Sequence, residues 1–178
     1  MLYPKVQVID SHTAGEPTRV VVDGAPKNPG ATPAEWREFL RNEHDWLRTA
    51  MACEPRGHEA VVGALLCEPT QPDCVAGVVF FNNVGYLHGC LHGTIGVTVT
   101  LAHLGRLIEG ENRIETPTGI VTVRPPEDGW VTVQNVRSYR HAAAVPVEVP
   151  GWGTVQGLSL IHISEPTRPL YISYAVFC

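Results

Sequence analysis

The chain has 178 residues and a formal net charge of -5, so its surface is acidic. An acidic surface repels phosphate groups, which argues against nucleic acids and polyphosphates as partners. No apolar run approaches the roughly 20 residues of a membrane span, and the first residues lack a signal-peptide core. We therefore expect a cytoplasmic protein whose partner is a small molecule, with no nucleic acid and no membrane.

The first part of the chain is predicted to form two strands and a connection. Apolar and β-branched residues at 6–9 and 18–22 are typical of strands, and the stretch between them reads as a turn-rich loop. Proline, asparagine and glycine at 26–30 indicate a connection that leads out of the second strand.

A helix should follow this connection. Thr32 is a candidate N-cap, Pro33 suits the first helical position, and Glu35 completes a capping box. One apolar face of the helix is expected to contain Trp36, Phe39, Leu40, Leu47, Ala50 and Met51. Because proline disfavours helical geometry in the preceding residue, the helix should end at Glu54 and residues 54–58 should form a loop.

The rest of the chain alternates between apolar strands and one apolar helix. The segment 94–104 is apolar nearly all round, which predicts a buried helix. Strands are expected at 61–67, 75–82, 114–115, 120–123 and 130–135, with a turn at Asp128-Gly129 before the last of them. The fold class is therefore α/β (α+β), a mainly β domain that encloses a central helix.

Cys90 lies in a glycine-bounded turn within residues 85–96, directly before this helix. Free N–H groups at a helix N-terminus give a positive potential, which lowers the pKa of a nearby thiol and favours the thiolate. The same N–H groups can hold a carboxylate. This segment is therefore the best candidate for a reactive thiol that acts as a base or a nucleophile.

Other interpretations of Cys90 remain open from the residues alone. A free cysteine is often a small buried apolar residue. His88, Cys90 and His92 alternate, and on an extended strand they would offer three ligands to a metal ion. Gly89 and Gly93 favour a turn over a strand, and the absence of a nearby Cys-x-x-Cys pair weakens a redox role.

Several separated motifs stand out along the chain. Residues 9–19 read Ile-Asp-Ser-His-Thr-Ala-Gly-Glu-Pro-Thr-Arg, and residues 54–58 read Glu-Pro-Arg-Gly-His. Residues 85–96 contain the cysteine motif, and the segments 116–121 and 133–136 follow it. In their order and spacing these motifs resemble the proline racemase family, which includes proline racemase, hydroxyproline 2-epimerase and trans-3-hydroxyproline dehydratase. The last two segments look like later strands of that family.

The resemblance implies a fold like that of diaminopimelate epimerase, with two similar lobes that face each other across a cleft. Each lobe would contribute one catalytic residue, because inversion requires a base on one face of the α-carbon and an acid on the other. This scheme needs no cofactor. The present chain carries only the first lobe, so the opposing residue would lie far beyond residue 157, and we expect the chain alone to have no turnover.

The resemblance also assigns the site residues. Cys90 would be one acid/base thiol, and the amides of Leu91 and His92, with Gly93 beside them, would bind the substrate carboxylate. The His92 ring would either take part or only close the loop. The family usually has glycine where this chain has Leu91, which would either strain the loop or leave a usable N–H. From the residues alone, 54–58 form either a solvated connection or a loop in which Arg56 or His58 borders the pocket as support.

Three functions follow in order of preference. The first is the N-terminal half of a cofactor-independent racemase or epimerase that acts on proline or hydroxyproline. The complete enzyme could form a homodimer. The second is trans-3-hydroxy-L-proline dehydratase of the same family. The third is a metal-binding or ligand-binding module that uses His88, Cys90 and His92, although we assign no metal site in the preferred interpretation.

The last segment of the chain is predicted to be foreign to the protein. Residues 158–168 look like the translation of a transposase sequencing adapter, and residues 172–178 like the primer sequence beyond it. We therefore assign residues 1–157 to the N-terminal lobe and residues 158–178 to no native domain. Within the native part, Cys53, Cys67, Cys74 and Cys90 are expected to be reduced.

Overall fold

The computed structural model describes residues 5–28 and 30–161. The chain divides between Val136 and Arg137 into two compact units, each described by itself. Within the described ranges, no helix has both the length and the apolar character required to cross a membrane.

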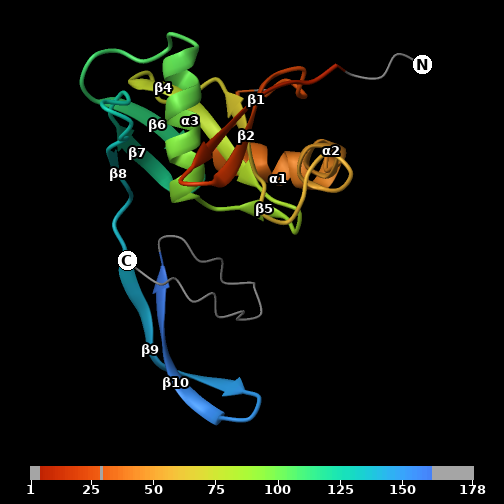
Figure 1. Cartoon of the computed structure of the whole chain (residues 1–178), viewed down its shortest axis with the longest axis vertical. Coiled ribbons are helices and arrows are strands. Elements are labelled where there is room, and N and C mark those ends of the chain that lie inside the picture. Colours follow the sequence, from red (N-terminus) through yellow and green to blue (C-terminus); the bar gives the residue numbers. More distant parts are fainter. Residues whose placement is uncertain (1–4, 29, 162–178) are drawn as a thin grey trace. The chain divides into compact units, whose positions relative to one another are not determined.

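The first unit is built on a mixed sheet with helices on its faces (Figure 1). Its strands are β1 (Gln7–Thr13), β2 (Glu16–Asp23), β3 (Val62–Cys67), β4 (Cys74–Phe81), β5 (Tyr86–Leu87), β6 (Asn112–Thr116), β7 (Gly119–Val123) and β8 (Val133–Gln134). Its helices are α1 (Pro33–Glu43), α2 (Trp46–Ala52) and α3 (Leu91–His103). The strand order is β1-β2-β3-β4-β6-β7-β8, and β5 also pairs with β4. Only the pairs β2–β3 and β4–β6 are parallel among those described.

Successive residues of the central strands enter two different hydrophobic cores, because side chains alternate between the faces of a sheet. On one face, Val20, Ala64, Val78 and Phe80 pack with residues of α3. On the other face, their neighbours Val21, Leu65, Val79 and Phe81 pack with residues of α1 and α2. Figure 1 shows α3 on one side of the sheet and α1 and α2 on the other. The near-continuous apolar strands reflect burial on both faces.

The predicted start of α1 is confirmed. The Glu35 N–H donates to the Thr32 hydroxyl at 3.3 Å, and the Thr32 N–H donates to the Glu35 carboxylate at 2.9 Å. The prediction of one continuous helix is wrong. His44 leaves helical geometry with φ −137°, and a second helix, α2, begins at Trp46. Asp45 stabilises the restart by accepting two hydrogen bonds from Arg48 at 2.7 and 2.8 Å.

The first two strands are longer than predicted, and the expected turn-rich loop between them shrinks to two residues. Ala14 and Gly15 form this turn, both with positive φ (49° and 98°). Such turns match the twist of a β-hairpin and require residues that tolerate the left-handed region. The polar motif at 9–19 is therefore mostly strand.

Helix α3 is confirmed but begins at Leu91, three residues before the predicted start. Its packing against β2 depends on Gly96, where an added Cβ would lie 2.6 Å from the Thr18 Cβ. The prediction of burial holds for most of the helix, but Leu91 is 40% exposed and Val99 is 38% exposed. Together with half-buried Ile95, they form an apolar stripe at helical spacing on the outer face.

The later strands agree with the prediction except at the last one. β6 and β7 contain the expected segments. The turn at Asp128-Gly129 connects Glu127 to Trp130, and these two residues form a single isolated β-bridge. The paired strand β8 includes only Val133–Gln134 of the predicted 130–135.

The second unit contains a hairpin that the sequence did not predict. β9 (Tyr139–Val149) pairs antiparallel with β10 (Gly153–Ile161). The pairing register becomes irregular between Gly157 and Ser159 and again between Ser159 and Leu160. Of the tail that was predicted to be foreign, residues 162–178 lie outside the described residues.

Candidate functional site

Cys90 is the N-cap of α3, immediately after the short strand β5 and the residues 88–89. Its thiol accepts a hydrogen bond from the Gly93 N–H at 3.4 Å. Its carbonyl accepts from both the N–H and the hydroxyl of Thr94, at 2.9 and 2.8 Å. These bonds fix the thiol directly over the first turn of the helix, as the sequence predicted.

The expected low pKa of Cys90 is wrong for this chain. Burial raises the pKa of the thiol above its ordinary value, because the charged thiolate loses water. The N–H groups of Gly93 and His92 oppose this shift, but they do not outweigh it. The positive helix terminus that was predicted is therefore present, and desolvation determines the net direction.

The His92 side chain lies beside the thiol. Its Nδ1 atom is 3.6 Å from the Cys90 Sγ. Burial lowers the pKa of the imidazole, and the charge of Glu16 and the main chain of Pro17 act in the opposite direction. His92 is therefore mainly neutral at pH 7, and a neutral imidazole has one nitrogen that can accept a proton.

The first and third motifs meet at this point. The Thr13 hydroxyl donates a hydrogen bond to the His92 carbonyl at 3.2 Å, across 79 residues of sequence. The tip of the β1–β2 hairpin thus lies against the first turn of α3. Sequence reasoning assigned no role to Thr13 or Glu16, although both lie in the motif at 9–19, because a local pattern does not show which helix a hairpin tip contacts.

Leu91 does not strain the loop. It is the first residue of α3, and it is absent from the described non-glycine residues with positive φ. The N–H of a residue at this helical position has no acceptor within the helix, so it remains a donor for a ligand. Gly93 is required for packing, because a Cβ there would lie 2.9 Å from the Phe80 ring and 3.2 Å from the Cys90 Sγ.

The second motif is joined to the first by Arg19. Its guanidinium donates to the Arg56 carbonyl at 2.6 Å and forms a two-pronged ion pair with Asp10 at 2.9 Å for each bond. Arg56 and His58 also line a small hollow of about 150 Å³ next to Arg19. The structure thus brings these motifs together, and the supporting role of Arg56 or His58 in a substrate pocket stays a prediction.

The metal hypothesis for His88, Cys90 and His92 required an extended strand, which is not found. Cys90 caps a helix, His92 lies inside that helix, and the His88 Nδ1 atom is 2.6 Å from a guanidinium nitrogen of Arg37. Across residues 5–28 and 30–161, no cluster of three or more potential metal-binding side chains occurs. These three side chains are therefore not arranged as a ligand set.

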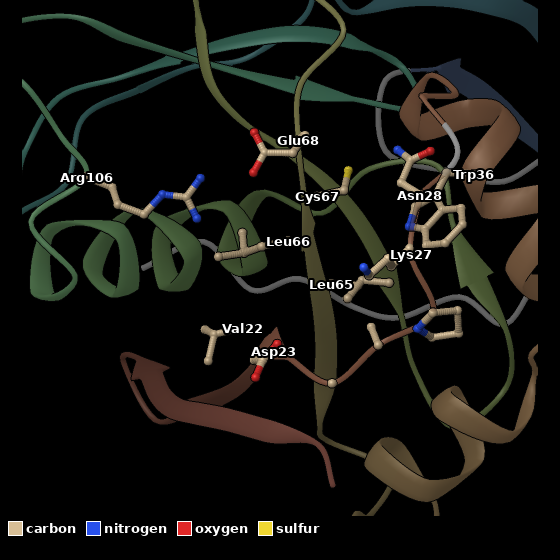
Figure 2. A pocket seen from close by; sticks show the side chains of 13 residues that line it. Val22, Asp23, Lys27, Asn28, Trp36, Leu65, Leu66, Cys67, Glu68 and Arg106 are labelled. Atoms are coloured by element: carbon tan, nitrogen blue, oxygen red, sulfur yellow. The ribbon is translucent and has the colours of Figure 1, made fainter. Parts of the chain in front are cut away.

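A separate hollow of about 380 Å³ lies at the carboxyl ends of the parallel strands β2 and β3. Figure 2 shows Trp36 and Arg106 on opposite sides of it, with Leu65 and Cys67 between them. Burial raises the pKa of Cys67 to about 12, so this thiol stays protonated at neutral pH. None of the predicted site residues lines this hollow, so it is not part of the candidate site.

Comparison with known proteins shows what the chain resembles. Residues 8–157 match the family model described as proline racemase. The chain is 56% identical over 153 residues to the 4-hydroxyproline 2-epimerase of Burkholderia ambifaria, which covers 86% of this chain and 49% of that protein. It is 57% identical over 152 residues to the enzyme of the same name from Xanthomonas campestris pv. campestris, with 85% and 49% covered.

Two solved structures share the fold. A probable proline racemase from Agrobacterium radiobacter K84, with bound carbonate, has a TM-score of 0.79 and 28% identity over 88% of this chain and 49% of its own. A hydroxyproline epimerase from Agrobacterium vitis, with bound trans-4-hydroxy-L-proline, has a TM-score of 0.79 and 25% identity over 87% and 48%. The predicted fold class is confirmed, and the chain spans about half the length of the curated relatives it matches.

Proposed function

Because this chain belongs to the proline racemase family, we propose that it is the N-terminal half of a hydroxyproline epimerase or a proline racemase. The observation that supports this most directly is the placement of Cys90 as the cap of α3, within the segment that matches the family. Relatives at 56–57% identity are named as 4-hydroxyproline 2-epimerases, so an isomerase is the reaction class that we infer.

In this proposal Cys90 exchanges the α-proton of the substrate. A thiol on one face of the α-carbon removes the proton, and a second acid on the opposite face supplies another. Burial favours the neutral thiol in the isolated chain, while the N–H groups of Gly93 and His92 favour the thiolate. A neutral thiol suits the acid, and a thiolate suits the base, so a small shift in this balance would change its role.

The substrate carboxylate would bind at the N-terminus of α3. The amides of Leu91 and His92 belong to the first turn of α3 and have no acceptor within the helix, and the His92 amide also acts on the Cys90 thiol. Donors at a helix terminus also stabilise negative charge that develops at the adjacent α-carbon. Binding and acceleration would thus use the same groups, with Gly93 allowing the helix to approach Phe80 closely.

The dehydratase is not favoured over the epimerase. The two relatives at 56% and 57% sequence identity are named as 4-hydroxyproline 2-epimerases. The hydroxyproline epimerase of Agrobacterium vitis shares the fold. The metal-binding module is weaker still, because its three side chains are not gathered around one point.

A chimeric enzyme tests the proposal. Residues 1–157 are joined to the second half of the Burkholderia ambifaria 4-hydroxyproline 2-epimerase, and epimerisation of trans-4-hydroxy-L-proline is followed by chiral chromatography. The chimera should be active. Cys90→Ser should lower α-proton exchange by about 100- to 10,000-fold, the range of an acid/base group, whereas Cys53→Ser, at another free thiol, should not.

The chain of 178 residues is the second arm of this test. We expect no epimerisation by it, because the opposing acid/base residue is supplied by the other half. Turnover by the pure chain would contradict the proposal, and so would unchanged proton exchange by the Cys90→Ser chimera.

The proposal also includes a cytoplasmic location, a homodimeric complete enzyme and a foreign origin for the last residues. The described cysteines are all free thiols, which supports the cytoplasm. A homodimer is proposed for the complete enzyme, and size-exclusion chromatography of the chimera tests it. The family match ends at residue 157, which supports a foreign origin for residues 158–178. Sequencing of the source DNA would test this origin.

A further inference from the structure

Strands β2 and β3 separate before they end, and the hollow of about 380 Å³ lies where they part. Their parallel pairing ends at Val21 and Leu65, although both strands continue for two more residues. The segments 22–24 and 66–68, which follow the last pair, both line the hollow. The crevice outside the carboxyl ends of parallel strands is a common place for a ligand in α/β sheets. The hollow therefore has the position of a binding site.

Trp36 brings an unused hydrogen-bond donor to this hollow. Its side chain lines the hollow from α1 and is only 1% exposed. The indole N–H is buried and has no hydrogen-bond partner among the described residues. Figure 2 shows the indole nitrogen on the ring edge that is turned toward Lys27 and Leu65. Buried donors in native structures nearly always have an acceptor, so this N–H is available to an acceptor on a ligand.

The N–H has no exposed surface in the structure, so contact with a ligand requires a small movement. Lys27 is exposed and lies beside the ring edge in Figure 2. A long, flexible side chain of this kind can change rotamer without moving the helix. A small rotation of the ring or of Lys27 thus opens the donor to the hollow.

Four exposed charged side chains surround the hollow, namely Asp23, Lys27, Glu68 and Arg106. None of them takes part in an ion pair within residues 5–28 and 30–161. The Arg106 guanidinium donates to the Val75 carbonyl at 3.2 Å, which holds this cation at the rim. Two carboxylates and two cations carry no net charge together, so a ligand with both signs of charge matches the rim better than a simple anion or cation.

The floor of the hollow is apolar. Leu65 is 2% exposed and lies between Trp36 and Arg106 in Figure 2. The Cys67 thiol beside it stays neutral at pH 7, because burial raises its pKa to about 12. Ligand sites for small molecules are typically apolar, with a few polar groups that orient the ligand. This floor and rim together fit a small molecule that carries two opposite charges next to an apolar group.

We propose that the hollow binds a free amino acid with an apolar side chain. At neutral pH such a molecule is a zwitterion. Its carboxylate accepts hydrogen bonds from the Trp36 N–H and from Lys27, which lie on one side of the hollow in Figure 2. Its ammonium group donates to Asp23 or Glu68, and its side chain packs on Leu65.

This site is separate from the candidate site around Cys90. Cys90 caps the first turn of α3, whereas Arg106 follows the last turn. The helix has 13 residues, so its two ends are about 20 Å apart at about 1.5 Å per residue. The inference goes beyond the proposed function and does not rest on it, because binding here involves no proton exchange.

The experiment follows the indole N–H signals of the 178-residue chain by nitrogen–proton NMR while L-leucine is added. The chain has four tryptophans, and Trp36→Phe identifies the signal of Trp36. That signal should shift in a saturable way, whereas the other three should not. Leucinamide lacks the carboxylate and isocaproate lacks the ammonium group, so each should bind at least about five-fold more weakly than leucine.

Variants at the rim identify the groups that hold the ligand. Lys27→Gln and Glu68→Gln should each raise the Kd for leucine by about two- to five-fold, because each removes one exposed charge from the rim. Glu109→Gln makes the same change as Glu68→Gln at an exposed residue outside the hollow, and it should leave the Kd unchanged. Cys90→Ser should leave it unchanged as well. Circular dichroism on each variant shows that the fold is retained.

Three results would overturn the inference. One is a Trp36 signal that does not move at leucine concentrations up to about 50 mM, where even millimolar affinity would saturate a site. The second is equal binding of leucine, leucinamide and isocaproate. The third is loss of the shift in folded Cys90→Ser, which would place the amino acid at the candidate site.

The outcome is independent of the test of the proposed function. Binding to the hollow requires neither Cys90 nor the second half of the enzyme. An inactive chimera would therefore count against the proposed function and leave a positive titration standing. An active chimera together with an unmoved Trp36 signal would count against this inference alone.

Discussion

Helices α1 and α3 begin in opposite ways. At α1, the Thr32 hydroxyl, the Glu35 carboxylate and the imino nitrogen of Pro33 leave little free at the terminus. At α3, the cap is a cysteine whose thiol accepts the Gly93 N–H, and the first turn has no acidic side chain. Both termini are capped by their own residues, but at α3 the Leu91 N–H has no acceptor within the helix and is one of the donors that we propose for the substrate carboxylate.

The outer faces of the same two helices differ as well. Between its buried residues, α1 exposes charged side chains such as Glu38 and Arg41, which form an ion pair at 3.6 Å. α3 exposes the apolar stripe that includes Leu91 and Val99. A face of this kind is typical of contact with another protein surface. α1 also exposes one large apolar side chain, Phe39, at 36%. The apolar stripe of α3 is longer, so α3 is the better candidate for a contact surface.

The largest expected effect comes from removing each of the two caps in turn and comparing stability with activity. In the chimera, Thr32→Ala should lower the free energy of unfolding by about 1 kcal/mol and leave epimerisation within about two-fold. Cys90→Ala should do the opposite, with an activity loss of about 100-fold or more and a smaller change in stability. Urea denaturation and chiral chromatography measure the pair. A Thr32 variant with greatly reduced activity would remove the distinction.

The next effect concerns the close packing behind the α3 cap. Gly93→Ala should lower the free energy of unfolding by about 1–3 kcal/mol, because the new methyl group would overlap the Phe80 ring and press on the Cys90 thiol. Gly85→Ala is the matched control, since no atom lies within 4 Å of a Cβ there and its φ is not positive. Equal thermal midpoints for the two variants would show that the first turn can shift freely.

A smaller effect is expected on self-association. The apolar stripe of α3 should make the 178-residue chain associate at high concentration, and Val99→Lys should shift the equilibrium toward monomer. The side chain is 38% exposed, so the substitution leaves the core intact. Sedimentation velocity measures the change. Val84→Lys, at a 72% exposed residue outside the stripe, is the control and should have less effect.

The smallest effect is the pH dependence of the α1 cap. Hydrogen bonds from Thr32 lower the pKa of Glu35, so its contribution is present above the pKa of the unfolded state and is lost as the pH falls through the folded value. The difference in urea midpoint between the native chain and Thr32→Ala should therefore shrink from pH 7 to pH 3. In a Glu35→Gln background this difference should not depend on pH in that way.

The contrast between the caps also explains what the sequence could predict. The α1 cap was found because Thr32, Pro33 and Glu35 are neighbours and their roles follow from local rules. The start of α3 was placed three residues late, because cysteine is not a usual cap and Gly93 suggested a turn. The break before α2 was missed, because the apolar spacing continues through His44 and Asp45.

The candidate site was predictable only in part. The glycine-rich segment around Cys90 showed where a thiol could lie, but the direction of its pKa shift depends on burial by Phe80 and other residues that are distant in sequence. The contact from Thr13 to His92 spans 79 residues, and only the folded hairpin creates it.

Gly96 determines how closely α3 packs against β2. The helix rests on Thr18 at a position where even one methyl group would come within 2.6 Å of the strand. Because α3 is a rigid rod, anything that lifts it at Gly96 also lifts its first turn, one and a half turns away. The thiol and the amides beside it would then move together, relative to the substrate position that we propose. The missing side chain of Gly96 thus sets the distance between α3 and β2, and with it the position of the Cys90 thiol.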